Sequence, residues 1–326
     1  MKTIKKLYSY LFAEIEGSNL GIFRILTSIV TIVMMISLIP DLLNIFGSNG
    51  YFNQEIMDVF KSSLVPRIEW ILTPLKNLFG LSEQVALFAI LFLYMGSLIL
   101  LLLGVATRVS AFFSFLFCAM FTGSGAPFIY GVDYFILSCL FYCFLFPVSN
   151  SFTIFHLTGK KTNYKVLRIY TIFILAHLCM VYFFNGIAKS LGETWYSGEA
   201  IWRAVMLLDT RQYNMAFLAD FPNFLKYSSL TVLCFELFFP LLILKRITRI
   251  PTIIVIFSTH VFIGLFMGLY FFAAIMITLN ITVFYNEYIL IIKKVKYYFE
   301  IVLKWSIGKL SLANIQTIRK IKTMEH

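Results

Sequence analysis

Long apolar runs alternate with short polar segments along most of the chain. A helix that crosses a membrane needs roughly 20 mostly apolar residues, and shorter ones occur in multi-pass bundles. The pattern therefore predicts an all-α, polytopic transmembrane helix bundle. We expect about eight spans, at about 20–40, 85–104, 109–122, 134–147, 166–184, 229–244, 252–268 and 269–286.

The last two spans form one apolar tract, which is too long for a single ordinary crossing. A tight turn is expected within it, in the region from Gly264 to Gly268.

The basic residues test this count independently, because cytoplasmic loops of membrane proteins carry an excess of Lys and Arg. With the N-terminus inside, 19 of the 27 Lys and Arg residues fall in cytoplasmic segments. We therefore predict that both termini are cytoplasmic. The expected organisation is a cytoplasmic amphipathic segment over 1–19, a transmembrane domain over 20–286 and a basic amphipathic cytoplasmic tail over 287–326.

The composition agrees with a multi-pass protein of the cell membrane. Hydrophobic residues make up 60% of the chain and charged residues only 13%, against roughly 25% charged in a soluble domain. The net charge of +11 is interpreted as basic loops facing anionic membrane lipid, and not as a nucleic-acid surface. All five cysteines lie in apolar segments without metal-type spacing, so structural disulfides are not expected.

Two predicted external segments, 41–84 and 185–228, are long enough to hold structure. The first contains IEWILTPLKNLFG and the second AIWRAVMLL, and both resemble helices lying at the membrane interface. The second segment opens with NGIAKSLGETWYSGEA. There Gly186 fits a helix C-cap after Phe184, and later glycines allow sharp turns.

Lys189 in this stretch admits two interpretations. It can anchor a helix end at the headgroups, as Trp195 also does. Alternatively it performs chemistry, because a lysine partly desolvated beside an apolar pocket can act as a base near neutral pH.

Ionisable groups within the spans each need an explanation, because a bilayer penalises them by about 2.5–3.5 kcal/mol even on the lenient scale. Arg24 lies near the inner end of its span and is expected to snorkel to the headgroups. His177, Glu236 and His260 all fall roughly 11 Å below the outer surface, at 1.5 Å per helical residue. They predict a polar latch between helices, a cavity open to the outside or a His-Glu-His metal site. Asp133 fits a helix N-cap at the outer surface, or a member of the same site.

The stretch VYFFNGIAKSLGETW resembles a segment of the vitamin K-dependent gamma-carboxylases and their bacterial relatives, the horizontally transferred transmembrane (HTTM) domain proteins. Lys189 aligns with the second of that family's adjacent lysines, and Ala188 stands at the first. Further blocks are similar in the same order: GIFRILTSIV, LGVATRVSA, YGVDYFILSCLFYCFLFPVSNSF, WYSGEAIWRAV, FELFFPLLIL and IFSTHVFIGLFMGLYFFAAIMI.

The resemblance implies a site and a cofactor. Lys189 would be the base that deprotonates a reduced, vitamin K-like quinone. His177, Glu236 and His260 would line the pocket of this apolar cofactor, and Trp195 and Tyr182 would contact it.

Within the family, a stand-alone chain of this size most resembles the B component of sporulation-delaying-protein-type antimicrobial peptide systems. That similarity implies maturation of a secreted peptide precursor on the outer face, together with co-encoded maturation proteins. A non-enzymatic membrane chaperone or export partner for a hydrophobic peptide is the alternative. A small-solute transporter is less favoured, because no paired broken helices of the inverted-repeat type are evident.

Overall fold

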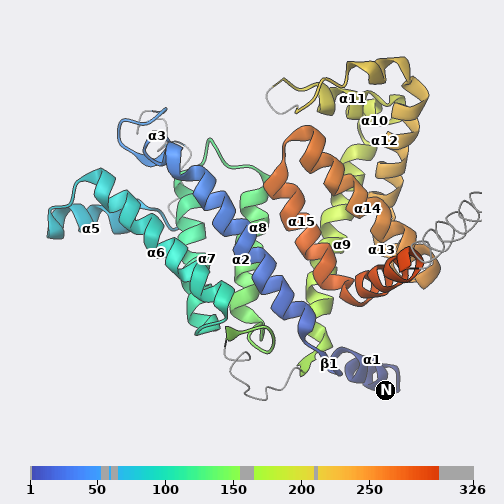
Figure 1. Cartoon of the computed structure of the whole chain (residues 1–326), viewed down its shortest axis with the longest axis horizontal. Coiled ribbons are helices and arrows are strands. Elements are labelled where there is room, and N and C mark those ends of the chain that lie inside the picture. Colours follow the sequence, from blue (N-terminus) through green and yellow to red (C-terminus); the bar gives the residue numbers. More distant parts are fainter. Residues whose placement is uncertain (1, 53–58, 60–64, 155–164, 209–211, 301–326) are drawn as a thin grey trace, which may run out of the picture. The chain divides into compact units, whose positions relative to one another are not determined.

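The computed structural model describes residues 2–52, 59, 65–154, 165–208 and 212–300 (Figure 1). These residues are helical almost throughout, which confirms the all-α prediction. The exception is a short antiparallel pair, β1 (Glu14–Glu16) with β2 (Lys165–Leu167), in which Ile15 lies opposite Val166. The chain divides into two units, residues 1–283 and 284–326.

The first unit begins with α1 (Lys2–Leu11), β1 and then α2 (Ser18–Leu38). A 3-10 turn, η1 (Ile39–Asp41), and α3 (Leu42–Phe46) continue α2, so the helical stretch Ser18–Phe46 is 29 residues long. The other elements of this unit are α5 (Glu69–Phe79), α6 (Glu83–Leu103), α7 (Thr107–Ser124), α8 (Gly131–Leu145), β2, α9 (Arg168–Ser190), α10 (Glu193–Ser197), α11 (Glu199–Met206), η3 (Ala216–Asp220), α12 (Pro222–Leu237), α13 (Phe239–Leu242), α14 (Arg246–Met267) and α15 (Tyr270–Val283).

Every apolar run that predicts a span lies mostly on helix. Four helical stretches are long and apolar enough to cross a membrane: Ser18–Phe46, α6, α9 and α14. A fifth is obtained if α15 is counted with the helix Tyr285–Glu300. A multi-pass chain is therefore supported, while the number eight and the side on which each terminus lies stay predictions.

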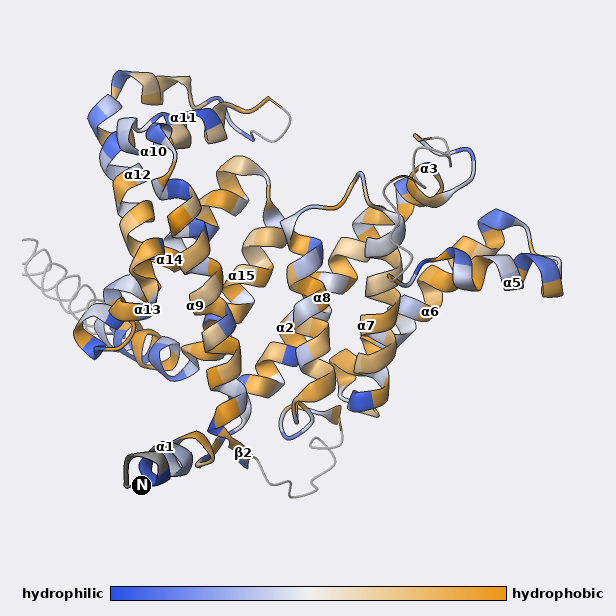
Figure 2. Ribbon diagram, turned by 180° about the vertical axis from the view of Figure 1, so that it is seen from behind, coloured by the Kyte–Doolittle hydropathy of each residue, from blue (hydrophilic) through white to orange (hydrophobic). Residues whose placement is uncertain are grey.

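Local sequence accounts for several helix ends. The long apolar tract near the C-terminus is split as predicted, because Gly268 adopts a left-handed conformation with φ of +68° and ends α14. The helices α5 and α11 occupy the two segments expected to hold interfacial helices. Figure 2 shows hydrophilic residues gathered on α5, α10 and α11, whereas the longer helices are largely hydrophobic.

Two groups of helices meet at α15. In one group α6 packs against α2 and α7, and α7 packs against α8; in the other α12 packs against α9 and α14. The helix α15 contacts α2, α8, α9 and α14, and it lies between the two groups in Figure 1. The buried face of α15 holds small and polar side chains among its apolar ones, which suits close packing of helices.

Arg24 does not snorkel, so that expectation is wrong. Its side chain is fully buried, with none of its surface exposed. One guanidinium nitrogen donates to the carbonyls of Leu101 and Leu102 at 2.6 and 2.9 Å, and the other donates to that of Phe152 at 2.7 Å. The end of α6 leaves carbonyls without helical partners and carries a partial negative charge, both of which favour a cation there.

Gly104, the residue that ends α6, makes room for this guanidinium. Its φ is +75°, and a Cβ there would lie 2.7 Å from Arg24 Nη1 and 2.5 Å from Thr153 Cγ2. Arg24 therefore joins α2, the end of α6 and the segment around Phe152 into one structural unit.

Candidate functional site

Lys189 lies in the last turn of α9, and not in a loop. The predicted helix end after Phe184 is therefore wrong. Gly186 sits within the continuous helix, where a Cβ would lie 2.5 Å from Leu237 Cα and 2.6 Å from Leu237 N. The glycine serves a close approach of α9 to α12, as small residues do where membrane helices pack tightly.

That approach brings Lys189 against Glu236, the residue beside Leu237 on α12. The Lys189 ammonium forms an ion pair and hydrogen bond with Glu236 Oε2. The lysine side chain is 24% exposed and the glutamate only 8%. Tyr182, Gly186 and Lys189 follow one another at spacings of four and three residues, which places them on one face of α9.

Trp195 covers the same lysine from the following helix. The Lys189 Nζ atom lies 4.9 Å from the centroid of the Trp195 ring, a distance at which an ammonium is attracted by the ring face. Trp195 belongs to α10, and Gly198, with φ of +92°, makes the turn from α10 into α11. Lys189 is thus held on two sides, by a carboxylate and by an indole.

His260 belongs to a buried hydrogen-bond chain with Tyr182 and Asn280. The Asn280 amide nitrogen donates to the Tyr182 hydroxyl at 2.7 Å and to the Met276 carbonyl at 2.8 Å. The Tyr182 hydroxyl and His260 Nε2 share a hydrogen bond of 2.9 Å.

His177 lies outside this chain. Its Nδ1 atom is 2.8 Å from the Tyr142 hydroxyl of α8, and its ring lies 6.4 Å from that of Phe135. His177, Glu236 and His260 are therefore each engaged by a different partner, namely Tyr142, Lys189 and Tyr182. Within the described ranges no group of three His, Cys, Asp or Glu side chains is placed to hold a metal ion.

Asp133 lies on the other group of helices, in the first turn of α8. The sequence predicts Asp133 as the N-cap, whereas the structure shows it as the third helical residue of a capping box. Its Oδ2 accepts a hydrogen bond of 2.9 Å from the backbone nitrogen of Tyr130, the true N-cap. The physical role foreseen for Asp133 therefore holds, since a carboxylate in the first turn satisfies a free amide and complements the helix dipole.

An apolar groove of about 510 Å³ lies on the surface between α9 and the segment that joins α12 to α13. Its lining includes Leu237, which follows Glu236 in α12, and Phe183, which lies three positions before Gly186 in α9. The groove is lined by Phe183, Leu237, Phe238, Pro240 and Leu241. Such a surface suits a lipid chain or another long apolar molecule.

Three residues of this region were not foreseen in their roles. Asn280 carries a signal that could have revealed it, because its amide side chain lies well inside the apolar run 269–286. Gly186 and Tyr142 carry no such signal, since their roles depend on the helices that pack against them.

Comparison with known protein families, with curated proteins and with solved structures finds no match for this chain.

Proposed function

We propose that this chain is a multi-pass protein of the cell membrane that acts on a secreted peptide, with the Lys189–Glu236 pair as the place where a bound apolar molecule gives up a proton. The observation that carries the proposal is the ion pair itself. A membrane penalises each ionised side chain by about 2.5–3.5 kcal/mol, so intramembrane charges commonly mark functional sites.

A structural latch between α9 and α12 is the plain alternative. Polar contacts between membrane helices contribute about 0.6–2 kcal/mol. Two neighbours of the pair go beyond what a latch requires. The Trp195 ring lies against the ammonium, and the apolar groove is lined in part by Leu237, the residue that follows Glu236 in α12. Together they provide a charged centre next to a surface from which an apolar ligand can approach.

The chemistry follows from the two side chains. A ligand hydroxyl within reach of Glu236 can transfer its proton to the carboxylate, which becomes the neutral acid. The ligand oxygen keeps the electron pair of the broken O–H bond and becomes an anion. The Lys189 ammonium then balances that anion, so the site contains one positive and one negative charge before and after the transfer. In this scheme Glu236 is the proton acceptor and Lys189 the electrostatic stabiliser, a division of roles often used in catalysis.

The resemblance of the stretch around Lys189 to the gamma-carboxylase-like HTTM family supplies the ligand class. A reduced quinone is an apolar molecule with an acidic hydroxyl, and the groove offers apolar side chains for its hydrocarbon part. The proposed peptide substrate and the proposed location on the outer face rest on the same resemblance.

The test co-expresses this chain with any secreted peptide precursor found to be encoded beside its gene. Mass spectrometry of the released peptide compares the native chain with Lys189→Arg and Glu236→Gln. Arginine keeps the charge but not the compact ammonium geometry, and glutamine keeps the shape but cannot take the proton. We expect both variants to leave the peptide unprocessed.

Lys226→Arg is the matched control, because Lys226 is an exposed lysine of α12 with no part in the pair. It should process the peptide like the native chain. Normal processing by both Lys189→Arg and Glu236→Gln would refute catalysis at the pair. Normal processing with reduced release of the peptide would instead favour the chaperone or export alternative.

A further inference from the structure

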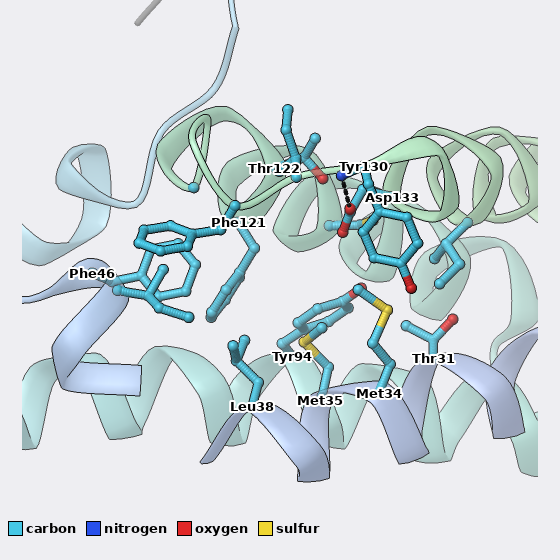
Figure 3. Close-up of a pocket in the computed structure, with 16 residues that line it drawn as sticks. Thr31, Met34, Met35, Leu38, Phe46, Tyr94, Phe121, Thr122, Tyr130 and Asp133 are labelled. Atoms are coloured by element: carbon cyan, nitrogen blue, oxygen red, sulfur yellow. Dashed lines mark hydrogen bonds between the residues drawn. The ribbon is translucent and has the colours of Figure 1, made fainter. Parts of the chain in front are cut away.

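A second cavity lies among the helices of the other group, away from the helices that carry Lys189 and Glu236. Its volume is about 130 Å³. Figure 3 shows Tyr94 and Met35 on one side of it, Asp133 and Tyr130 on the opposite side, and Phe46 with Phe121 at one end. The lining residues are Thr31, Met34, Met35 and Leu38 of α2, Ile45 and Phe46 of α3, Tyr94 of α6, Cys118, Phe121 and Thr122 of α7, Gly125, Phe128, Ile129 and Tyr130 of the connection, and Asp133 and Ile136 of α8.

The size of the cavity limits what it can hold. An apolar cavity of about 150 Å³ accepts benzene, so about 130 Å³ corresponds to one small ring. The walls suit a ring as well. Aromatic rings and two methionine thioethers face the space, and both types of group make favourable contacts with an aromatic guest.

The Tyr94 hydroxyl adds a polar feature that the fold does not use. Tyr94 is fully buried, and its oxygen has no nitrogen or oxygen partner within the described part of the chain. The Cys118 thiol beside it is only a weak hydrogen-bonding group. An unpaired buried hydroxyl costs free energy, and a ligand that pairs with it would recover that cost.

Asp133 gives the cavity its charge preference. One oxygen of its carboxylate accepts the Tyr130 amide, and a carboxylate has about four acceptor positions in all. No Lys or Arg is among the lining residues. A ligand that donates a hydrogen bond is therefore favoured at this end, and an anion is repelled.

We propose that this cavity binds a small uncharged molecule with a single ring and one hydrogen-bond donor, such as a simple phenol. The hydroxyl lies between Tyr94 and Asp133, and the ring packs among Phe46, Phe121 and the methionines of α2. This site goes beyond the function proposed above, because none of its residues belongs to the Lys189–Glu236 pair.

The test uses the full chain in lipid nanodiscs and fluorine NMR of three probes: 4-fluorophenol, fluorobenzene and 4-fluorobenzoate. Cys118→Leu is the blocking variant, since the added side-chain volume fills much of the cavity. Subtracting its signal from that of the native chain removes partition into lipid. We expect 4-fluorophenol to bind the native chain about tenfold more tightly than fluorobenzene, the difference that one net hydrogen bond makes. We expect 4-fluorobenzoate not to bind.

Tyr94→Phe tests the hydroxyl directly. It keeps the ring but removes the oxygen, so the preference for 4-fluorophenol over fluorobenzene should shrink. Its melting temperature should change little, because the thiol of Cys118 beside the native hydroxyl is only a weak hydrogen-bonding group. Tyr142→Phe is the matched control, since that hydroxyl is paired with His177 and its removal should lower the melting temperature while probe binding is unchanged.

If Cys118→Leu does not fold, Cys118→Met replaces it, because an unbranched side chain adapts to the shape of a gap. Equal binding of 4-fluorophenol to the native chain and to the blocking variant overturns the proposal. So does binding of 4-fluorobenzoate as tight as that of the phenol, or a preference that survives in Tyr94→Phe.

Discussion

The close approach of α9 to α12 at Gly186 leads to a prediction about Gly186→Ala. The new Cβ would lie 2.5 Å from Leu237 Cα, about 0.9 Å closer than the 3.4 Å of ordinary contact. The obstructing atoms are backbone, so no side-chain rotation relieves the clash and the helices must separate. Overpacking of this kind costs about 1–3 kcal/mol, and the better helix propensity of alanine returns about 1 kcal/mol. Because the obstructing atoms cannot move away, we place the overpacking cost toward the upper end of that range. We therefore expect a net destabilisation of about 1–2 kcal/mol.

The measurement is reversible unfolding in mixed micelles with increasing denaturing detergent. Gly96→Ala is the matched control, because Gly96 lies in the middle of α6 and nothing is within 4 Å of a Cβ there. That variant should be as stable as the native chain or more stable by about 1 kcal/mol. If Gly186→Ala is as stable as Gly96→Ala, the close contact between α9 and α12 does not exist. Processing of the peptide should also fall in Gly186→Ala, because the separation draws Lys189 away from Glu236.

Three further predictions concern buried polar groups. Glu236→Leu alone should cost about 3 kcal/mol, whereas adding Lys189→Met should recover most of it, and a double-mutant cycle without coupling would exclude the ion pair. Arg24→Lys should lower stability by about 1–3 kcal/mol despite keeping the charge, since an ammonium cannot span both groups of carbonyls; unchanged thermal unfolding would contradict this role. Asn280→Leu should lower the free energy of unfolding by about 0.6–2 kcal/mol and shift the nitrogen resonances of His260. Unaltered resonances would refute the hydrogen-bond chain from Asn280 through Tyr182 to His260.

The positions and ends of the helices depend largely on residues that are neighbours in the sequence. The eight apolar runs all lie mostly on helix, and Gly268 ends α14 inside the tract where a turn was expected. These features follow from the chain itself, because run length and a residue that tolerates positive φ act through neighbouring residues. The capping role of Asp133 belongs to the same class, although Asp133 is the third helical residue and not the N-cap.

The candidate site was foreseen only in part. Lys189 and Trp195 were singled out by their type and position, and Glu236 and His260 by their charge or polarity within apolar runs. The pairing was not foreseen: Glu236 meets Lys189, His260 meets Tyr182, and His177 meets Tyr142. Equal depth along separate helices does not fix which faces of those helices meet.

The residues of the chain alone predict the helical class, the positions of the apolar helices and the residue types that carry charge into them. Three features depend instead on how the helices pack: the close contact at Gly186, the burial of Arg24 and the place of Tyr94 at the wall of a cavity. The physical reason is that helix formation depends on residues within about one turn, whereas burial, pairing and cavities depend on helices that are distant in the chain.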